Sequence, residues 1–306
     1  MFKHLLVPLD GSKMAEAALP AAVYLAGGQG ARLTLLHVIE RGAPREVHGQ
    51  RHLTSPDEAQ GYLDEVAARF ISSGVLIDLH VHANEVRDVA LSIAGHVQEF
   101  GPDLISMCTH GSGGLRGFLF GRIAQQVMSL VSTPLFLVPP ASEGFTCRKI
   151  VVPLDGNPDH EEGLRFGKRL AEIYRAELHL IMVVHTSSTL SGEKAVTAKM
   201  LPRVTRALLD LAEEDARQYL QRHLTDLQAS GFTATAAVRR GNPAKIIGST
   251  ADRTGADLVV LATHGKTGLD AFWSGSATPD VASRSPVPLL LVPATPEISE
   301  PQDRVS

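Results

Sequence analysis

The sequence has few cysteines, no excess of basic residues and no apolar run of membrane-spanning length. Its 306 residues include only Cys108 and Cys147, too few for a disulfide framework. The formal net charge of −4 argues against a general binder of nucleic acid or anionic membranes, because such proteins carry a basic surface. No N-terminal signal pattern is present. We therefore expect a soluble, cytoplasmic protein that binds neither nucleic acid nor membrane.

Motifs of several enzyme classes are absent as well. The chain has no G-x-x-x-x-G-K-[ST] loop, which argues against a Walker-type ATPase, and no G-x-S-x-G elbow with triad partners. Cysteine and histidine do not cluster at zinc spacing, so we expect no metal site made of protein ligands. His48 and His52 are expected to be ordinary loop residues. No residue is assigned a catalytic role.

An internal repeat dominates the chain. Segment 3–11, which ends in Pro-Leu-Asp-Gly, returns at 148–156, an offset of 148 − 3 = 145. Segment 103–111, which ends in Thr-His-Gly, returns at 257–265, an offset of 257 − 103 = 154. The second copy therefore carries 154 − 145 = 9 extra residues between these motifs. Ordered recurrence of both motifs indicates duplication, and we expect two domains, 1–141 and 147–295.

Short apolar runs alternate with longer amphipathic stretches in each copy. Continuous apolar runs suit strands buried on both faces of a parallel sheet. Five strands alternating with four helices predict an α/β protein with two doubly wound, Rossmann-like sheets of strand order 3-2-1-4-5. The expected strands lie near 2–9, 31–39, 75–82, 103–108 and 134–139, and near 148–154, 176–184, 232–238, 257–262 and 288–293.

The helices of the first copy are expected at 12–27, 56–73, 86–100 and 121–131. The extra residues of the second copy are expected within a long helix inside 198–230. Segment 41–55, with Gly42, Pro44 and further breakers, is predicted to be an irregular loop.

A glycine loop follows the fourth strand of the second copy. The apolar run 258–262 leads into Thr263, His264 and Gly265, and Gly275-Ser276 follows after nine residues, before a helical pattern. Glycines let backbone N–H groups approach a ligand, and a helix start adds free N–H donors and partial positive charge. This combination suits phosphate.

Asp155 follows the first strand of the second copy, at the switch point where a doubly wound sheet binds its ligand. Asn157 and Pro158 are typical of the N-cap and first residue of the next helix, which would leave the Asp155 carboxylate free to face the crevice. An aspartate at a turn also commonly binds the N–H groups of its own turn. The residues alone leave both interpretations open.

This loop resembles the nucleotide loop of the universal stress protein family, in which a small residue, two residues, Gly, nine residues and Gly-Ser follow one another. The resemblance extends over nearly the whole chain, in two tandem copies. It implies a site for ATP or another adenine nucleotide, with Mg²⁺ or Mn²⁺ on the phosphates. Asp155 would contact adenine, the Val183 backbone would recognise the base, and the glycine loop would hold ribose and phosphates. The implied domain 2 residues are Pro153, Asp155, Val183, Leu261, Ala262, His264, Gly265, Gly275, Ser276 and Ala277.

Domain 1 departs from the family pattern at two positions. Cys108 occupies the first small-residue position and Arg122 replaces the serine after Gly121. Arg122 would either bind phosphate or fill the pocket as a built-in cation, so we expect weak or no nucleotide binding in domain 1. Cys108 near a loop rich in N–H groups also permits a redox interpretation, although a buried apolar role is favoured. The domain 1 counterparts are Pro8, Asp10, Val38, Met107, His110, Gly111, Gly121 and Arg122.

The resemblance implies a binding and regulatory module of the stress response. A slow ATPase or adenylate-transferring enzyme, and a nucleotide-free dimerisation scaffold, are the alternatives. The fifth strands, 135–138 and 289–292, are apolar edges that need partners. We expect them to pair, giving an intramolecular pseudo-two-fold dimer of domains, and the sequence leaves open whether two chains form a homodimer.

Overall fold

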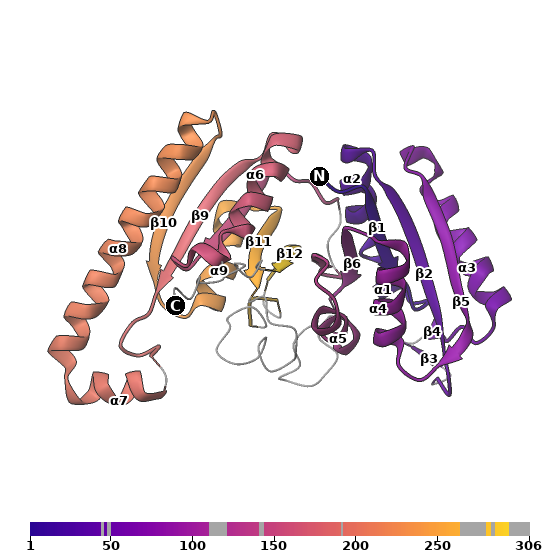
Figure 1. The fold of residues 1–306 in the computed structure, drawn as a ribbon, viewed down its shortest axis with the longest axis horizontal. Helices are drawn as coiled ribbons and strands as arrows, with labels where there is room; N and C mark the ends of the chain where they lie inside the picture. The colour runs from indigo at the N-terminus through magenta and orange to yellow at the C-terminus, as the bar shows by residue number, and fades with distance from the viewer. Residues whose placement is uncertain are drawn as a thin grey trace, which may run out of the picture.

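The computed structural model describes residues 1–43, 46–47, 50–109, 121–140, 144–190, 192–263, 280–282 and 285–293. These residues form one ten-stranded sheet with helices on both faces, and a separate two-stranded hairpin (Figure 1). No helix in this described part of the chain is long and apolar enough to cross a lipid bilayer.

The first half of the sheet has the strand order β5-β2-β1-β6-β7, which is 3-2-1-4-5 in chain order within the repeat, as predicted. All neighbouring strands within it are parallel. Its elements are β1 (His4–Pro8), α1 (Lys13–Glu16), α2 (Leu19–Gln29), β2 (Arg32–Glu40), α3 (Pro56–Ala68), β5 (Ile77–Val86), α4 (Val89–Phe100), β6 (Leu104–Cys108), α5 (Arg122–Leu130) and β7 (Leu135–Val138).

The second half repeats this order as β10-β9-β8-β11-β12, again with parallel neighbours. The predicted α/β fold with two doubly wound halves is therefore confirmed. Its elements are β8 (Lys149–Leu154), η2 (Pro158–His160), α6 (Glu162–Tyr174), β9 (Glu177–Val184), α7 (Gly192–Met200), α8 (Pro202–Ala229), β10 (Ala234–Arg240), α9 (Pro243–Thr254), β11 (Leu258–Thr263) and β12 (Leu289–Pro293).

Two local predictions need adjustment, and a third is confirmed. The first helix is split into α1 and α2, and α2 begins with a proline, Pro20, in its first turn. Proline lacks the N–H donor that a continuous helix requires, so the break falls there. The loop 41–55 is not wholly irregular, because β3 (Glu46–Val47) and β4 (Gln50–Arg51) pair as a short antiparallel hairpin. The long helix expected within 198–230 is confirmed as α8, 28 residues long.

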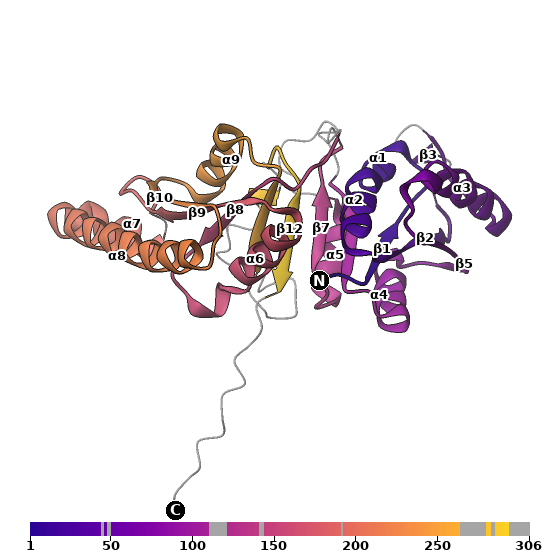
Figure 2. The same cartoon turned by 90° about the horizontal axis from the view of Figure 1, so that it is seen from above.

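The two halves join through their fifth strands. β7 and β12 pair antiparallel, with Leu137 opposite Leu289 and Leu135 opposite Leu291, and they lie side by side at the centre of the molecule (Figure 2). The predicted pairing of these apolar edges is confirmed, and it removes two exposed strand edges. Since two halves of the same strand order meet antiparallel, a pseudo-two-fold relates them.

One hydrophobic core runs across the junction on one face of the sheet. Tyr24 of α2 stacks on Tyr174 of α6 with ring centroids 5.3 Å apart, and the Tyr174 hydroxyl donates to the Leu25 carbonyl at 2.9 Å. Phe2 also packs against Phe166 in a tilted arrangement, with ring centroids 6.2 Å apart. Aromatic pairs of this kind add to the energy of area burial, so the halves are held by packing as well as by strand pairing.

Candidate functional site

In each half the first and fourth strands pair briefly and then separate. β1 and β6 are paired only at Leu5 and Leu6, and β8 and β11 only at Ile150 and Val151. By contrast, β8 is paired with β9 from Lys149 to Leu154. The carboxyl ends of these strands therefore separate at the switch point, where a doubly wound sheet binds its ligand, and in the first half a pocket lies there.

Five of the domain 2 residues implied by the resemblance lie at the carboxyl ends of three neighbouring strands, β8, β9 and β11. They are Pro153, Asp155, Val183, Leu261 and Ala262. The other five lie outside the described residues and are His264, Gly265, Gly275, Ser276 and Ala277. The described part of the site thus provides a carboxylate and small or apolar walls.

The Asp155 carboxylate accepts hydrogen bonds within its own turn, as one of the two interpretations expected. One oxygen accepts the Asn157 N–H at 3.0 Å and the other accepts from His160 Nδ1 at 2.6 Å. The side chain nevertheless remains 54% exposed, so a ligand can reach it. The prediction that Asn157 and Pro158 start the next α-helix is wrong, because the short 3₁₀ turn η2 begins at Pro158 and α6 begins only at Glu162.

Helix α6 approaches the strand β11 closely beside this switch point. A Cβ added at Gly163 would lie 3.0 Å from the backbone nitrogen of Ala262 and 3.6 Å from its Cβ. Glycine is needed at 163 because the contacting atoms belong to the backbone and have little room to move. The methyl group of Ala262 is thus accommodated opposite a residue without a side chain.

A second set of polar side chains lies next to Asp155 and escaped the sequence analysis. Glu161 accepts from the Tyr219 hydroxyl at 2.8 Å and lies 3.2 Å from His223 Nε2. Burial, reinforced by the hydrogen bond to Glu161 and by the charges of Glu161 and Asp155, raises the pKa of Tyr219. These contacts tie α8 to the start of α6, and no local pattern signals a pairing between residues 58 positions apart.

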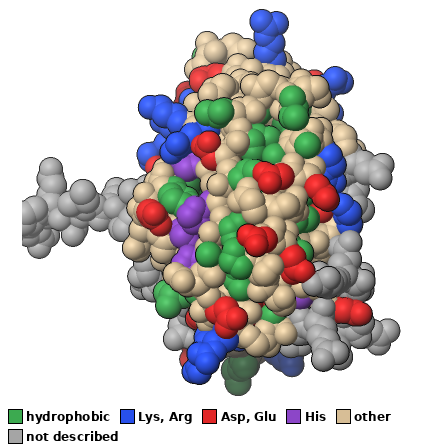
Figure 3. All heavy atoms as spheres, turned by 90° about the vertical axis from the view of Figure 1, so that its right-hand side faces the viewer, with side chains coloured by type: hydrophobic (Ala, Val, Ile, Leu, Met, Phe, Trp, Pro, Cys, Tyr) green, Lys and Arg blue, Asp and Glu red, His purple; other side chains and the backbone are tan. Residues whose placement is uncertain are grey.

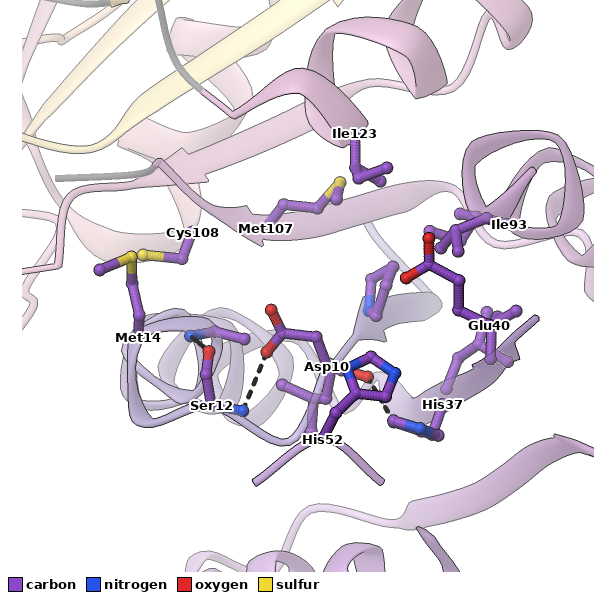
Figure 4. A pocket seen from close by; sticks show the side chains of 16 residues that line it. Asp10, Ser12, Met14, His37, Glu40, His52, Ile93, Met107, Cys108 and Ile123 are labelled. Carbon is purple, nitrogen blue, oxygen red and sulfur yellow. Dashed lines mark hydrogen bonds between the residues drawn. The ribbon is translucent and has the colours of Figure 1, made fainter. Parts of the chain in front are cut away.

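Domain 1 has a well-defined pocket of about 250 Å³ at the corresponding place (Figure 4). Four of its predicted residues line the pocket, namely Pro8, Asp10, Val38 and Met107. Gly121 and Arg122 begin α5 and do not line it, and the Arg122 side chain is exposed. The remaining two, His110 and Gly111, lie outside the described residues.

Cys108 also lines this pocket, as a buried thiol. Its Sγ donates to the Thr109 carbonyl at 3.2 Å. Burial, with a smaller contribution from Asp10, raises the pKa of Cys108 to about 12. Reactive cysteines require the thiolate, so the redox interpretation is disfavoured and the buried apolar role is supported.

Three further titratable residues line the domain 1 pocket, Glu40, His37 and His52. His37 is 1% exposed; its Nδ1–H donates to the Leu9 carbonyl at 2.8 Å, and its Nε2 has no hydrogen-bond partner. Burial lowers the pKa of His37 and keeps the ring neutral. His52 is buried with both ring nitrogens unpaired, so it is more than the ordinary loop residue that we expected.

The fold defines a class, that of tandem Rossmann-like α/β proteins with two doubly wound halves. The sequence profile of the universal stress protein family matches residues 1–139 and 146–293. The chain therefore belongs to the universal stress protein family.

Individual relatives agree with a tandem arrangement. Universal stress protein YxiE of Bacillus subtilis is 29% identical over 150 residues, which are 45% of this chain and 99% of YxiE. Universal stress protein MJ0531 of Methanocaldococcus jannaschii is 27% identical over 145 residues, which are 47% of this chain and 81% of that protein. Each relative thus corresponds to about one half of the chain.

Solved structures show the same fold over nearly the whole length. A universal stress protein from Archaeoglobus fulgidus aligns with a TM-score of 0.65 at 16% identity, covering 95% of this chain and 98% of its own. The functionally unknown protein PA1789 from Pseudomonas aeruginosa aligns with a TM-score of 0.67 at 16% identity, covering 96% of this chain and 93% of its own.

Proposed function

We propose that the protein binds an adenine nucleotide, ATP carrying Mg²⁺ or Mn²⁺, in the crevice of domain 2, and acts in the cytoplasm as a regulatory module of the stress response. The observation that carries this proposal is the separation of β8 from β11 beyond Val151. It leaves the half-exposed carboxylate of Asp155 on one side of the switch point and the start of the glycine loop on the other. We take domain 1 as 1–141 and domain 2 as 147–295.

The chemistry of the described groups fits an adenine ring. An adenine amino group is a hydrogen-bond donor, and Asp155 offers a carboxylate acceptor that is still 54% exposed. Val183 and Leu261, both partly buried, supply apolar surface at the ends of β9 and β11. When bound, Mg²⁺ would be held largely by phosphate oxygens and water, as is usual for this ion.

The two crevices differ in ways that favour nucleotide in domain 2. At the matched positions, domain 2 has Ala262 where domain 1 has the bulkier Cys108. It has His185 where domain 1 has Glu40, whose carboxylate lines the pocket. A carboxylate repels the phosphates of ATP, and a larger side chain takes space from the ribose.

Removing both obstacles should create a second site. In the double variant Cys108→Ala/Glu40→Gln, we expect the affinity of domain 1 for Mg²⁺–ATP to rise about tenfold. One charge ~10 Å away at an effective dielectric constant of ~20 contributes about 1.7 kcal/mol, somewhat more than the ~1.4 kcal/mol that a factor of ten requires. Calorimetric titration of the full chain should then show a second binding event. Glu65→Gln makes the same charge change on an exposed residue of α3 and should add no site.

We propose a binding module rather than an efficient enzyme. Asp155 is assigned to the base of the nucleotide, so hydrolysis would depend on positioning and metal alone and would be slow. Calorimetric titration of the full chain with Mg²⁺–ATP tests the proposal. We expect one binding site per chain, and the absence of saturable binding would contradict the proposal. Phosphate release over many turnovers, lost in Asp155→Ala, would instead support the ATPase alternative.

A further inference from the structure

Three histidines gather at the outer edge of the sheet, and none of them lines the domain 1 pocket. His80 and His82 are separated by one residue on the edge strand β5, so both side chains lie on the same face. His96 of α4 meets them there, with its ring centroid 4.7 Å from that of His80 and 5.0 Å from that of His82. Figure 3 views this end of the molecule and shows histidine side chains gathered on its surface.

The His96 ring is held between two hydrogen-bond partners. Its Nδ1 lies 3.1 Å from Glu99 Oε2, and its Nε2 lies 3.1 Å from His82 Nδ1. A carboxylate accepts, so His96 Nδ1 carries a proton, and in the neutral ring Nε2 presents a lone pair toward His82. Stacking on Phe100, with centroids 5.1 Å apart, and burial to 6% exposure fix the ring further.

This arrangement is the one that proteins use to prepare histidine as a metal ligand. A metal-binding imidazole almost always donates its other ring N–H to a carboxylate, carbonyl or water, which fixes the tautomer and makes the free nitrogen more basic. Glu99 provides that carboxylate for His96. Its side chain is 63% exposed, so its negative charge lies at the protein surface.

The ring spacing agrees with a shared ion. With Zn–N bonds of about 2.05 Å, two imidazole ligands of a tetrahedral ion have ring centroids about 5 Å apart. The observed centroid separations are 4.7 and 5.0 Å. The 3.1 Å between His82 Nδ1 and His96 Nε2 is a direct hydrogen bond in which the two nitrogens face each other, so the rings must turn before both can face an ion.

We propose that this cluster binds a divalent transition-metal ion such as Zn²⁺, with His96 Nε2, His82 Nδ1 and His80 as ligands and Glu99 orienting His96. Within the described residues, no three histidine, cysteine or acidic side chains already converge as a complete metal site. Binding therefore requires the half-buried rings of His80 and His82 to turn, and the His82 proton to move to Nε2. Water completes the coordination.

The test is titration of the full, untagged, chelator-treated chain with ZnCl₂ by calorimetry and with CoCl₂ by visible absorption, without nucleotide. We expect one ion per chain and the Co²⁺ absorption of a nitrogen-ligated site. Glu99→Gln should weaken binding about 10- to 100-fold, the usual loss when such a partner is removed, and His82→Gln should weaken it at least as much. Glu99 is exposed, so its variant should fold normally.

His179→Gln is the matched control. His179 lies on the strand β9, is bonded to Thr235 at 2.6 Å, and also has its pKa lowered by burial. Its replacement should leave Zn²⁺ affinity unchanged. Absence of Zn²⁺ binding by the unaltered chain would overturn the proposal. Binding that survives both Glu99→Gln and His82→Gln would place the ion elsewhere and would equally contradict it.

Discussion

Replacing Asp155 with alanine should lower the affinity for Mg²⁺–ATP by at least about tenfold. A hydrogen bond to a charged group contributes about 1.5–3 kcal/mol, and about 1.4 kcal/mol corresponds to a factor of ten. The lower end applies because the Asp155 side chain is half-exposed and already bonded to Asn157 and His160. Calorimetric titration of the full chain measures the change.

Asp10→Ala provides the matched comparison in domain 1. Asp10 follows β1 as Asp155 follows β8, and it accepts the Ser12 N–H at 2.9 Å just as Asp155 accepts the Asn157 N–H. If domain 2 holds the nucleotide, Asp10→Ala should leave the affinity nearly unchanged. A loss of affinity in Asp10→Ala with none in Asp155→Ala would move the site to the domain 1 pocket.

Gly28→Ala should destabilise the protein by about 1–3 kcal/mol, although alanine is normally the better helix former. A Cβ at Gly28 would lie 2.7 Å from the Tyr174 hydroxyl oxygen and closer still to the ring carbon Cε1. That ring is held by stacking on Tyr24 and by its bond to the Leu25 carbonyl, so it cannot move cheaply. Thermal and urea unfolding should show the loss.

Gly27→Ala is the matched control, one residue earlier in the same helix. Its added Cβ would meet only Val75 Cγ2 at 3.5 Å, an ordinary van der Waals contact. The reduced flexibility of alanine should make this change neutral or stabilising by up to about 1 kcal/mol. Equal effects of the two substitutions would show that the packing of Tyr174 on α2 does not join the halves as described.

The strands and their order were predictable because the pattern that specifies them is local and is repeated. Runs such as 5–8 and 150–154 are continuously apolar, which marks strands buried on both faces, and the Pro-Leu-Asp-Gly and Thr-His-Gly motifs fix their correspondence. The apolar fifth strands likewise predicted their own pairing, confirmed between β7 and β12.

Features that depend on contacts between distant residues were not predictable. The hydrogen bond from His160 to Asp155 depends on the η2 turn, and the link from Glu161 to Tyr219 depends on how α8 lies on α6. The hairpin β3–β4 has strands of two residues each, too short for any periodicity to mark. In the histidine cluster, the one-residue spacing of His80 and His82 was visible, but the position of His96 facing them was not.

The most direct test of the central claim is mass spectrometry of the small molecules released when freshly purified protein is denatured, with the Gly275→Val variant in parallel. The account predicts about one adenine nucleotide per chain, lost in the variant because a valine side chain at the glycine loop blocks backbone contact with phosphate. No nucleotide from the unaltered protein, together with no uptake of added Mg²⁺–ATP, would contradict it.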